Sequence, residues 1–466
     1  MINFRYLIFL SFVAALGGFL FGYDTAVISG TVNQVSTQFG LDTIAQGWYV
    51  GCALVGSIAG VMMAGWLSDR YGRKNIMILS SVLFSISAIG CAVSADIQQL
   101  VIYRIVGGIG IGVASIVSPL YISEISAAKY RGSMVTIFQL AITVGFFCAY
   151  LVNFGLLELS GSDFHAVNPL LRKIFSDEVW RGMLGAETFP AVLFFITIFF
   201  IPESPRWLLV KQRENQSLLI LNKIYLSNDA AVGQMNETKQ TLLSETRSEW
   251  RELWKPGIRR AVIIGVAIAM LGQFMGVNAV LYYGPTIFEN NGLSGGDSLF
   301  YQVMVGLANT AATVIALFII DRVGRKKLIY FGVSAMIFFL LLIAVYFSKG
   351  ESWGLPNILL LVFFMAYIFS TAISISAVVF VLLSEMYPNK VRGLAMSVAG
   401  LSLWTGTFLI GQLTPWLLAN LTPAGTFVLF ALMCIPYMLI MWKTVPETAG
   451  MSLEAIEEHW INSQKS

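Results

Sequence analysis

Twelve long apolar runs dominate the chain, and each is long enough for a helix to cross a lipid bilayer, which takes about 20 residues. Only 12% of the 466 residues are charged and 57% are hydrophobic, too little polar surface for a water-soluble fold. The runs lack the alternating segments of an outer-membrane barrel, so an all-α membrane protein is predicted. The runs lie near 6–29, 46–68, 75–94, 98–122, 132–156, 183–201, 258–288, 298–320, 327–347, 357–384, 392–417 and 423–443.

The basic residues predict the orientation of these spans. Twenty-four of the 29 Lys and Arg residues lie at the N-terminus, in the even-to-odd connections or in the C-terminal tail. By the positive-inside rule, both termini are expected in the cytoplasm of a multi-pass protein of the cell (inner) membrane. The first run could also be a secretory signal peptide, but it continues unbroken into Phe21-Gly22-Tyr23-Asp24, which favours a retained span. The net charge of +3 follows from this loop bias and gives no reason to expect nucleic-acid binding.

Charged loop motifs recur in the same order in the two halves of the chain. The segment Asp69-Arg70-Tyr71-Gly72-Arg73-Lys74 returns as Asp321-Arg322-Val323-Gly324-Arg325-Lys326. Ser123-Glu124 and Arg131-Gly132 return 261 residues later as Ser384-Glu385 and Arg392-Gly393. This order predicts two pseudo-symmetric six-helix bundles related by an axis along the membrane normal. The expected divisions are an N-terminal bundle at 1–202, an intracellular helical linker at 203–256, a C-terminal bundle at 257–447 and a cytoplasmic tail at 448–466.

These motifs resemble those of the sugar porter family of the major facilitator superfamily, over essentially the whole chain. The matching segments are the repeated motif above, Pro202-Glu203-Ser204-Pro205-Arg206-Trp207-Leu208, Pro446-Glu447-Thr448-Ala449-Gly450, and Gly276-Val277-Asn278 before Tyr282-Tyr283. The segment Gly18–Thr25 is most similar to bacterial proton-coupled pentose and hexose symporters. The resemblance implies the major facilitator fold and inward transport of a monosaccharide by alternating access.

Charged residues at the predicted inner ends of both bundles can pair and cap helix ends. One exposed pair contributes only about 0–1 kcal/mol, but several together could lock an inner gate. The alternative is that the Lys and Arg residues only fix the topology. The expected gate residues are Asp69, Arg73, Glu124, Arg131 and Glu203 in the first half, and Asp321, Arg325, Glu385, Arg392 and Glu447 in the second.

Three ionisable residues lie clearly inside predicted spans, where a charge costs at least about 2.5–3.5 kcal/mol. They are Asp24, Arg104 and Glu187. Asp24 and Arg104 can neutralise each other, and a proton on Asp24 would break that pair. In the symporters of the family the matching residues are linked to proton coupling, so the resemblance implies this role for all three. A static structural ion pair is the alternative.

Uncharged polar residues inside the spans are candidates for sugar contact, because an amide offers both donors and an acceptor to hydroxyl groups. Gln273 and Asn278 lie about 140° apart on a straight helix, so facing one cavity requires a bend, for which Gly272, Gly276 and Gly284-Pro285 are suited. Interhelical hydrogen bonding is the alternative use of any single amide. The candidates are Gln139, Gln273, Asn278 and Asn309, with Phe21, Tyr282, Tyr283, Phe380 and Trp404 as aromatic walls.

The chain departs from the family pattern at several of these positions. Gly272 replaces one of two consecutive glutamines, Phe380 replaces a tryptophan, and Ser376-Ala377 replaces a Gly-Pro pair in the tenth span. Leu403 and Phe146 stand where relatives have polar residues. Each lost hydrogen bond is worth about 0.5–1.5 kcal/mol. The preferred sugar therefore cannot be transferred from a relative, and the bend of the tenth span is left open.

The sequence thus predicts a proton–monosaccharide symporter, with a passive facilitator and a non-transporting sugar sensor as alternatives. Cys52, Cys91, Cys148 and Cys434 fall singly inside spans, without the spacing of metal ligands. No nucleophile motif or in-span histidine points to an enzyme. We expect no cofactor and no metal, a lipid bilayer as the surroundings, and a monomer.

Overall fold

The computed structural model describes residues 2–127, 129–161, 168–244, 250–255, 258–387, 391–445 and 447, and only the backbone of Leu170, Ser244 and Asp321. Twelve segments of these residues are long and apolar enough to cross a membrane, and each overlaps one predicted run. The all-helical prediction is therefore confirmed. The segments are Phe4–Gly30, Thr43–Tyr71, Arg73–Val93, Ile97–Ile125, Arg131–Gly161, Val179–Ile198, Ile258–Asn290, Gly295–Ile320, Arg325–Lys349, Asn357–Met386, Arg392–Asn420 and Thr422–Lys443.

The chain forms two compact units, Met1–Gln34 with Cys52–Thr246, and Val35–Gly51 with Arg247–Ser466. Helices α2 (Val32–Phe39) and α3 (Thr43–Tyr71) contribute to both units. The other helices of the first unit are α1 (Phe4–Val27), η1 (Ile28–Gly30), α4 (Arg73–Val93), α5 (Ile97–Ile125), α6 (Arg131–Gly161), α7 (Pro169–Arg172), η2 (Lys173–Asp177), α8 (Val179–Gly185), α9 (Thr188–Ile198), α10 (Pro205–Val210), α11 (Glu214–Ile224) and α12 (Asn228–Ser244).

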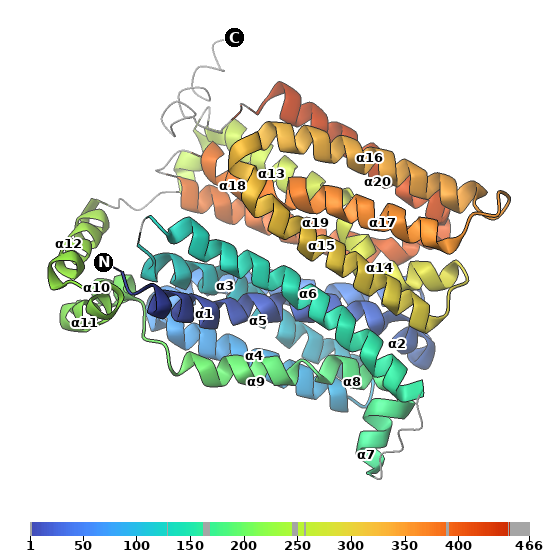
Figure 1. Cartoon of the computed structure of the whole chain (residues 1–466), viewed down its shortest axis with the longest axis horizontal. Coiled ribbons are helices and arrows are strands. Elements are labelled where there is room, and N and C mark those ends of the chain that lie inside the picture. Colours follow the sequence, from blue (N-terminus) through green and yellow to red (C-terminus); the bar gives the residue numbers. More distant parts are fainter. Residues whose placement is uncertain are drawn as a thin grey trace. The chain divides into compact units, whose positions relative to one another are not determined.

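The second unit contains the remaining spans, which Figure 1 draws in yellow-green to red. Its helices are η3 (Trp250–Trp254), α13 (Ile258–Phe274), α14 (Val277–Asn290), α15 (Gly295–Val323), α16 (Arg325–Lys349), α17 (Asn357–Thr371), η4 (Ala372–Ser376), α18 (Ala377–Met386), α19 (Arg392–Asn420) and α20 (Thr422–Lys443).

Glycines bring the backbones of α1 and α6 into direct contact. A Cβ on Gly22 would lie 2.0 Å from the Ile142 carbonyl oxygen, and one on Gly145 would lie 2.2 Å from the Phe19 carbonyl oxygen. Small residues permit such close helix packing in a membrane, where van der Waals contact replaces the hydrophobic driving force. This contact fixes α1, the helix that carries Asp24.

The short helices α10, α11 and α12 form a subdomain beside the N-terminus of the first unit (Figure 1). Their apolar faces meet in a small cluster of Leu209, Leu221, Ala231 and Met235. The Asn3 N–H donates to the Ile224 carbonyl at 2.8 Å, which ties the start of α1 to the end of α11. The described residues between 205 and 254 are therefore mostly helical.

The seventh span is broken between α13 and α14. Gly276 occupies the left-handed region with a φ of +89°, and a Cβ there would lie 2.3 Å from the Phe430 ring. Only glycine adopts this conformation without strain. The bend that Gln273 and Asn278 require is thus present, and Pro285 adds a second irregularity inside α14.

The tenth span is also interrupted, although it lacks the Gly-Pro pair of the family. The segment Ala372–Ser376 is a π-helical turn that ends directly before Ala377, where α18 begins. A π turn inserts an extra residue into the helical hydrogen-bond pattern and so changes the helix path. The tenth span is therefore interrupted by this turn, although Ser376-Ala377 replaces the Gly-Pro pair.

Candidate functional site

Asp24, Arg104 and Glu187 form a buried cluster in the first unit, which we call the acid–arginine cluster. Their exposed fractions are 0%, 2% and 2%. Arg104 donates through Nη1 to a carboxylate oxygen of Asp24, and also to the Asp24 backbone carbonyl at 3.3 Å. Glu187, between α8 and α9, interacts electrostatically with both residues. The structure therefore brings together three side chains that the sequence predicted from different spans.

Each carboxyl group of the acid–arginine cluster has one oxygen that no hydrogen bond reaches. Among the described residues, Asp24 Oδ2 and Glu187 Oε1 are buried without a hydrogen-bond partner. A Cβ on Gly107 of α5 would lie 2.8 Å from Asp24 Oδ2, so the glycine makes room for the carboxylate. Buried polar atoms normally have a hydrogen-bond partner, so each one that lacks a partner calls for an explanation. The hydrogen bonds of the described residues therefore leave one oxygen of each carboxyl group unused.

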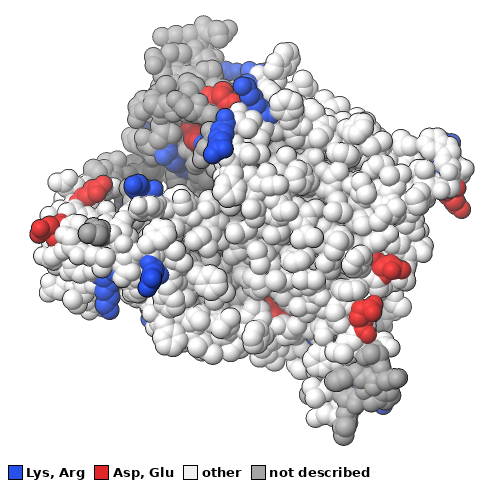
Figure 2. Space-filling view, viewed as in Figure 1, with Lys and Arg blue, Asp and Glu red and all other residues white. Residues whose placement is uncertain are grey.

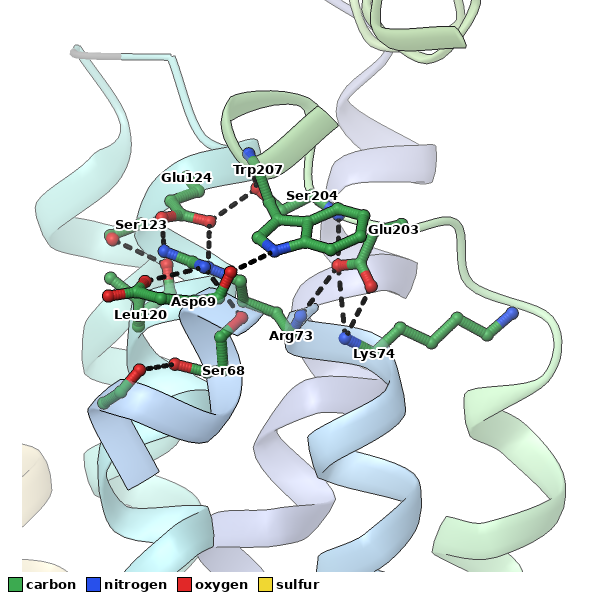
Figure 3. Close-up of polar contacts among 11 residues, drawn as sticks. Ser68, Asp69, Arg73, Lys74, Leu120, Ser123, Glu124, Glu203, Ser204 and Trp207 are labelled. Atoms are coloured by element: carbon green, nitrogen blue, oxygen red, sulfur yellow. Dashed lines mark hydrogen bonds and ion pairs between the residues drawn. The ribbon is translucent and has the colours of Figure 1, made fainter. Parts of the chain in front are cut away.

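Arg73, at the start of α4, is the centre of a first ionic cluster (Figure 3). Its guanidinium binds Glu124 of α5 through two hydrogen bonds of 3.0 and 2.9 Å, and pairs with Asp69 at 3.0 Å. The Ser204 hydroxyl also donates to Glu124. Such bidentate Arg–carboxylate pairs are strong and geometrically specific. Because Arg73 and Glu124 are largely buried, this pair is more than a solvated surface bridge.

Glu203 caps the N-terminus of α4 from the opposite side. It accepts hydrogen bonds from the backbone N–H groups of Arg73 at 2.9 Å, Lys74 at 3.2 Å and Ser204 at 2.7 Å. Burial raises the pKa of Glu203, and these N–H groups and the Arg73 charge oppose that shift. A carboxylate at this position stabilises both the free backbone donors and the positive end of the helix dipole.

The second unit repeats this arrangement in a second ionic cluster. Glu447 accepts from the N–H groups of Arg325 at 3.2 Å and Lys326 at 3.1 Å, at the N-terminus of α16. Arg325 pairs with Glu385 at 3.1 Å. The remaining predicted member, the Asp321 side chain, lies outside the described residues. The sequence repeat thus encodes the same helix cap and arginine pair in both units.

Arg131 and Arg392 make different contacts from the acid–base pairs around Arg73 and Arg325. Arg131 donates to the Ser123 carbonyl at 3.2 Å, and Arg392 donates to the Tyr387 carbonyl at 3.3 Å. These carbonyls lie near the C-terminal ends of α5 and α18, where a cation complements the helix dipole. Both arginines therefore stabilise helix ends next to the ionic clusters.

Gln273 and Asn278 face each other across the break in the seventh span. Asn278 donates its Nδ2 to Gln273 Oε1 at 2.8 Å, and the Thr407 hydroxyl of α19 donates to the same oxygen at 3.1 Å. Both amides are only partly buried. The bend at Gly276 is what brings them together, because a straight helix would separate their directions by about 140°.

The other predicted sugar contacts differ in how exposed they are. Tyr282, Tyr283 and Trp404 are buried, at 2%, 0% and 8%, and the Tyr283 hydroxyl donates to the Gly411 carbonyl at 2.6 Å. Asn309 is partly buried and Phe380 is 49% exposed, both in the second unit. Phe21 and Gln139 are partly buried residues of α1 and α6 in the first unit.

Charge is scarce on the visible surface over the middle of the helices, and most of the visible Lys and Arg residues lie toward one end (Figure 2). No group of three or more His, Cys, Asp or Glu residues in the described parts of the chain could hold a metal ion.

Residues 10–460 match the protein family described as "Sugar (and other) transporter". The chain belongs to the sugar porter family. An arabinose-proton symporter from Bacillus subtilis (strain 168) is 36% identical over 456 residues, which cover 98% of this chain and 95% of that protein. A D-xylose-proton symporter from Escherichia coli (strain K12) is 34% identical, with 98% and 96% coverage. The inward open conformation of the xylose transporter XylE from E. coli matches with a TM-score of 0.84 at 33% identity, covering 98% of this chain and 100% of that chain.

Sequence reasoning missed several polar residues that contribute to the architecture of this sugar porter. Thr407 and the fully buried Gln302 are uncharged polar residues inside spans, the same signal that selected Asn309. Trp207, inside the quoted Pro202–Leu208 motif, donates its indole N–H to the Asp69 carbonyl at 3.0 Å and so joins α10 to α3. The motif was recognised, but the role of its tryptophan was not.

Proposed function

We propose that this sugar porter imports a monosaccharide together with a proton by alternating access. The acid–arginine cluster carries the proposal, because a passive facilitator has no need of buried carboxyl groups that titrate. The proton-coupled relatives for arabinose and xylose support the same activity. The bias of Lys and Arg supports a location in the inner membrane with both termini in the cytoplasm.

The charge balance of the acid–arginine cluster supports coupling to one proton. Asp24, Glu187 and Arg104 sum to one negative charge when both carboxyls are ionised, and to zero when one is protonated. An uncompensated buried charge is costly. A proton entering from outside would therefore neutralise the cluster and permit the change of state, and would leave on the cytoplasmic side. One proton moving through about 100 mV supplies roughly 2.3 kcal/mol, enough for about fifty-fold accumulation.

The amides on either side of the break in the seventh span are suited to bind the sugar. The hydrogen bonds within this pair, as far as the structure describes them, use Gln273 Oε1 and Asn278 Nδ2. The Nε2 donors of Gln273 and the Oδ1 acceptor of Asn278 can then bind sugar hydroxyls of mixed orientation. Gln139, Asn309 and the aromatic residues Phe21, Tyr282, Phe380 and Trp404 complete the proposed contacts. The two ionic clusters act as inner gate latches.

Uptake by the purified protein in proteoliposomes tests this function. A panel of pentoses and hexoses is offered with and without an inward proton gradient, to the parent, Asp24→Asn and Glu351→Gln. Glu351 is exposed between α16 and α17 and serves as the matched carboxyl control. We expect Asp24→Asn to lose concentrative uptake while retaining sugar counterflow, with Glu351→Gln unchanged. If the proton gradient does not increase uptake of any sugar by the parent, the protein is a passive carrier or a sensor; unchanged accumulation by Asp24→Asn would remove that residue from the coupling.

A further inference from the structure

A small space beside Gly107 of α5 is bordered by polar atoms of two other helices. A Cβ on Gly107 would lie 2.8 Å from Asp24 Oδ2 of α1 and 2.4 Å from Ser87 Oγ of α4. The three atoms nearest to this position all belong to Ser87 and Asp24. Ser87 is buried, with 1% of its surface exposed. The glycine therefore lets a carboxyl oxygen and a hydroxyl group share one buried space next to the acid–arginine cluster.

The two carboxyl oxygens of Asp24 have different surroundings. Oδ1 accepts a hydrogen bond from Arg104 Nη1. Oδ2, the oxygen beside Ser87, has no hydrogen-bond partner within the part of the chain that the structure describes. A proton that binds to Asp24 without first displacing the guanidinium must therefore bind to Oδ2. The resulting O–H group is a hydrogen-bond donor, and a buried donor without an acceptor is costly.

The Ser87 hydroxyl is suited to accept this hydrogen bond. A serine oxygen has two acceptor lone pairs and one O–H that rotates to suit its neighbours. The Cys91 thiol, one turn later on α4, interacts with Ser87 and gives that O–H a second direction. Several ionisable groups also act on Asp24 electrostatically, and a change at Ser87 leaves all of them in place. They are Arg104 of α5, Cys52 of α3, Cys91 of α4 and Glu187 between α8 and α9.

We propose that Ser87 is a proton-coupling residue, which accepts a hydrogen bond from Asp24 Oδ2 when that oxygen carries the proton. Water delivers the proton, an O–H bond forms at Oδ2, and the Asp24 carboxyl becomes neutral. The negative charge that paired with Arg104 is then gone. When the proton leaves to water on the cytoplasmic side, the charge and the ion pair return. This inference rests on the proposed function for its transport readout and adds to it the residue that stabilises the bound proton.

The test measures proton binding and transport separately, with Ser87→Ala, Asp24→Asn and the control Ser80→Ala. Ser80 is a fully buried serine of α4 whose hydroxyl donates to the Gly110 carbonyl at 3.1 Å. Infrared spectra of the purified proteins are recorded from acid to alkaline pH. The C=O stretching band of a protonated carboxyl that Asp24→Asn lacks is assigned to Asp24, and its titration midpoint needs no sugar. Proton-driven uptake in proteoliposomes is measured over the same pH range.

Ser87→Ala is expected to lower the midpoint of the Asp24 band by about 0.5–1 pH unit, the equivalent of one hydrogen bond. The direction follows because a hydrogen bond to the neutral form opposes ionisation, so its loss lets the carboxyl ionise at a lower pH. The pH at which proton-driven uptake falls to half of its maximum should decrease by a similar amount. Ser80→Ala should match the parent in both measurements.

Four results would each overturn the inference. The first is the absence of any protonated carboxyl band that depends on Asp24, and the second is an unchanged midpoint in Ser87→Ala. The third is a raised midpoint, because the hydroxyl would then stabilise the ionised carboxylate. The fourth is an equal shift in Ser80→Ala, which would indicate an effect of packing between α4 and α5. If the parent shows no proton-driven uptake of any sugar, the proposed function fails, and the infrared titration still decides whether Ser87 stabilises the proton on Asp24.

Discussion

At the scale of single residues, a buried hydrogen bond can serve either structure or ligand binding, and geometry separates the two uses. Tyr283 was predicted as an aromatic wall of the sugar site, but its hydroxyl is engaged by the Gly411 carbonyl and its ring is fully buried. Gln273 and Asn278 are only partly buried and bind each other through one acceptor and one donor. The unused polar atoms of an amide pair, rather than its presence in a span, mark it for a ligand.

Replacing Asn278 with Ala tests this assignment. We expect the half-saturation concentration for sugar counterflow to rise about tenfold, because about 0.5–1.5 kcal/mol is lost for each hydrogen bond to the ligand. Thr407→Val is the matched control, because it removes the second donor to Gln273 Oε1, the oxygen to which Asn278 also donates. It should raise the half-saturation concentration less than Asn278→Ala does. Equal affinities of Asn278→Ala and the parent would place the sugar elsewhere.

Sequence alone identified the ionisable residues of the acid–arginine cluster, because a charge inside an apolar run stands out from its neighbours. It did not identify Gln302 or Thr407, whose partners, the Leu281 carbonyl and Gln273 Oε1, lie on other helices. Gln302 of α15 donates to the Leu281 carbonyl of α14, and no local sequence pattern links these two positions. The contacts between residues on different helices were therefore the part of the site that the sequence could not predict.

At the scale of elements, the starts of α4 and α16 are built from glycine and glutamate together. Gly72 and Gly324 have φ values of +99° and +92°. Each directly precedes an arginine whose backbone N–H donates a hydrogen bond to a glutamate, Glu203 in the first unit and Glu447 in the second. A Cβ on Gly72 would lie 2.2 Å from Glu203 Oε2, whereas one on Gly324 would lie 3.2 Å from Glu447 Oε2. The two caps have the same design, but the cap at Gly324 leaves more room for an added Cβ than the cap at Gly72.

This difference predicts an order of stability among alanine variants. Gly72→Ala should destabilise most, because backbone strain of about 1–3 kcal/mol adds to a displaced Glu203. Gly324→Ala should destabilise less, and Gly65→Ala should be nearly neutral, since Gly65 is helical and, among the described residues, no atom beyond its own stretch of helix lies within 4 Å of its added Cβ. Thermal unfolding in detergent measures the order. Equal losses for Gly72→Ala and Gly65→Ala would contradict the cap.

Glu203 also predicts a pH dependence. Its pKa in the folded protein is raised by burial, so the folded state binds this proton more tightly than the unfolded chain does. Its contribution to stability is therefore greatest below the usual glutamate pKa of about 4.3 and declines as the pH rises through the interval up to the raised value. The free energy of unfolding of the parent minus that of Glu203→Gln should fall as the pH rises through this interval. A difference that grows with pH would show the opposite shift.

Irregular elements were predicted well where glycine signals them and poorly where it does not. Gly276 marks the break of the seventh span, because only a residue without a side chain adopts its φ of +89° beside the Phe430 ring. In the tenth span Ser376-Ala377 gives no such signal, yet the π turn Ala372–Ser376 interrupts the helix there. A π turn depends on packing along the whole helix rather than on one residue type.

At the scale of the whole molecule, the twelve spans and the repeated motifs follow from the sequence because bilayer thickness fixes helix length. The repetition extends to side-chain contacts, as Arg73 with Glu124 and Arg325 with Glu385 are equivalent pairs. The repeat also determines sidedness. Spans that alternate in direction are expected to place all the charged motifs at one membrane face, and the excess of Lys and Arg predicts that this is the cytoplasmic face.

This sidedness can be tested with single new cysteines at Lys211, which is exposed after α10, and at Ser352, which is exposed between α16 and α17. The native Cys52, Cys91 and Cys434 are buried and Cys148 is partly buried, so the parent provides the background. A membrane-impermeant maleimide should label Ser352→Cys in intact cells, and should label Lys211→Cys only after the cells are permeabilised. Both charged caps then face the cytoplasm, and an inner gate is physically possible. The reverse labelling pattern would move the ionic clusters to the outer face and exclude their role as inner latches, whatever the transported sugar.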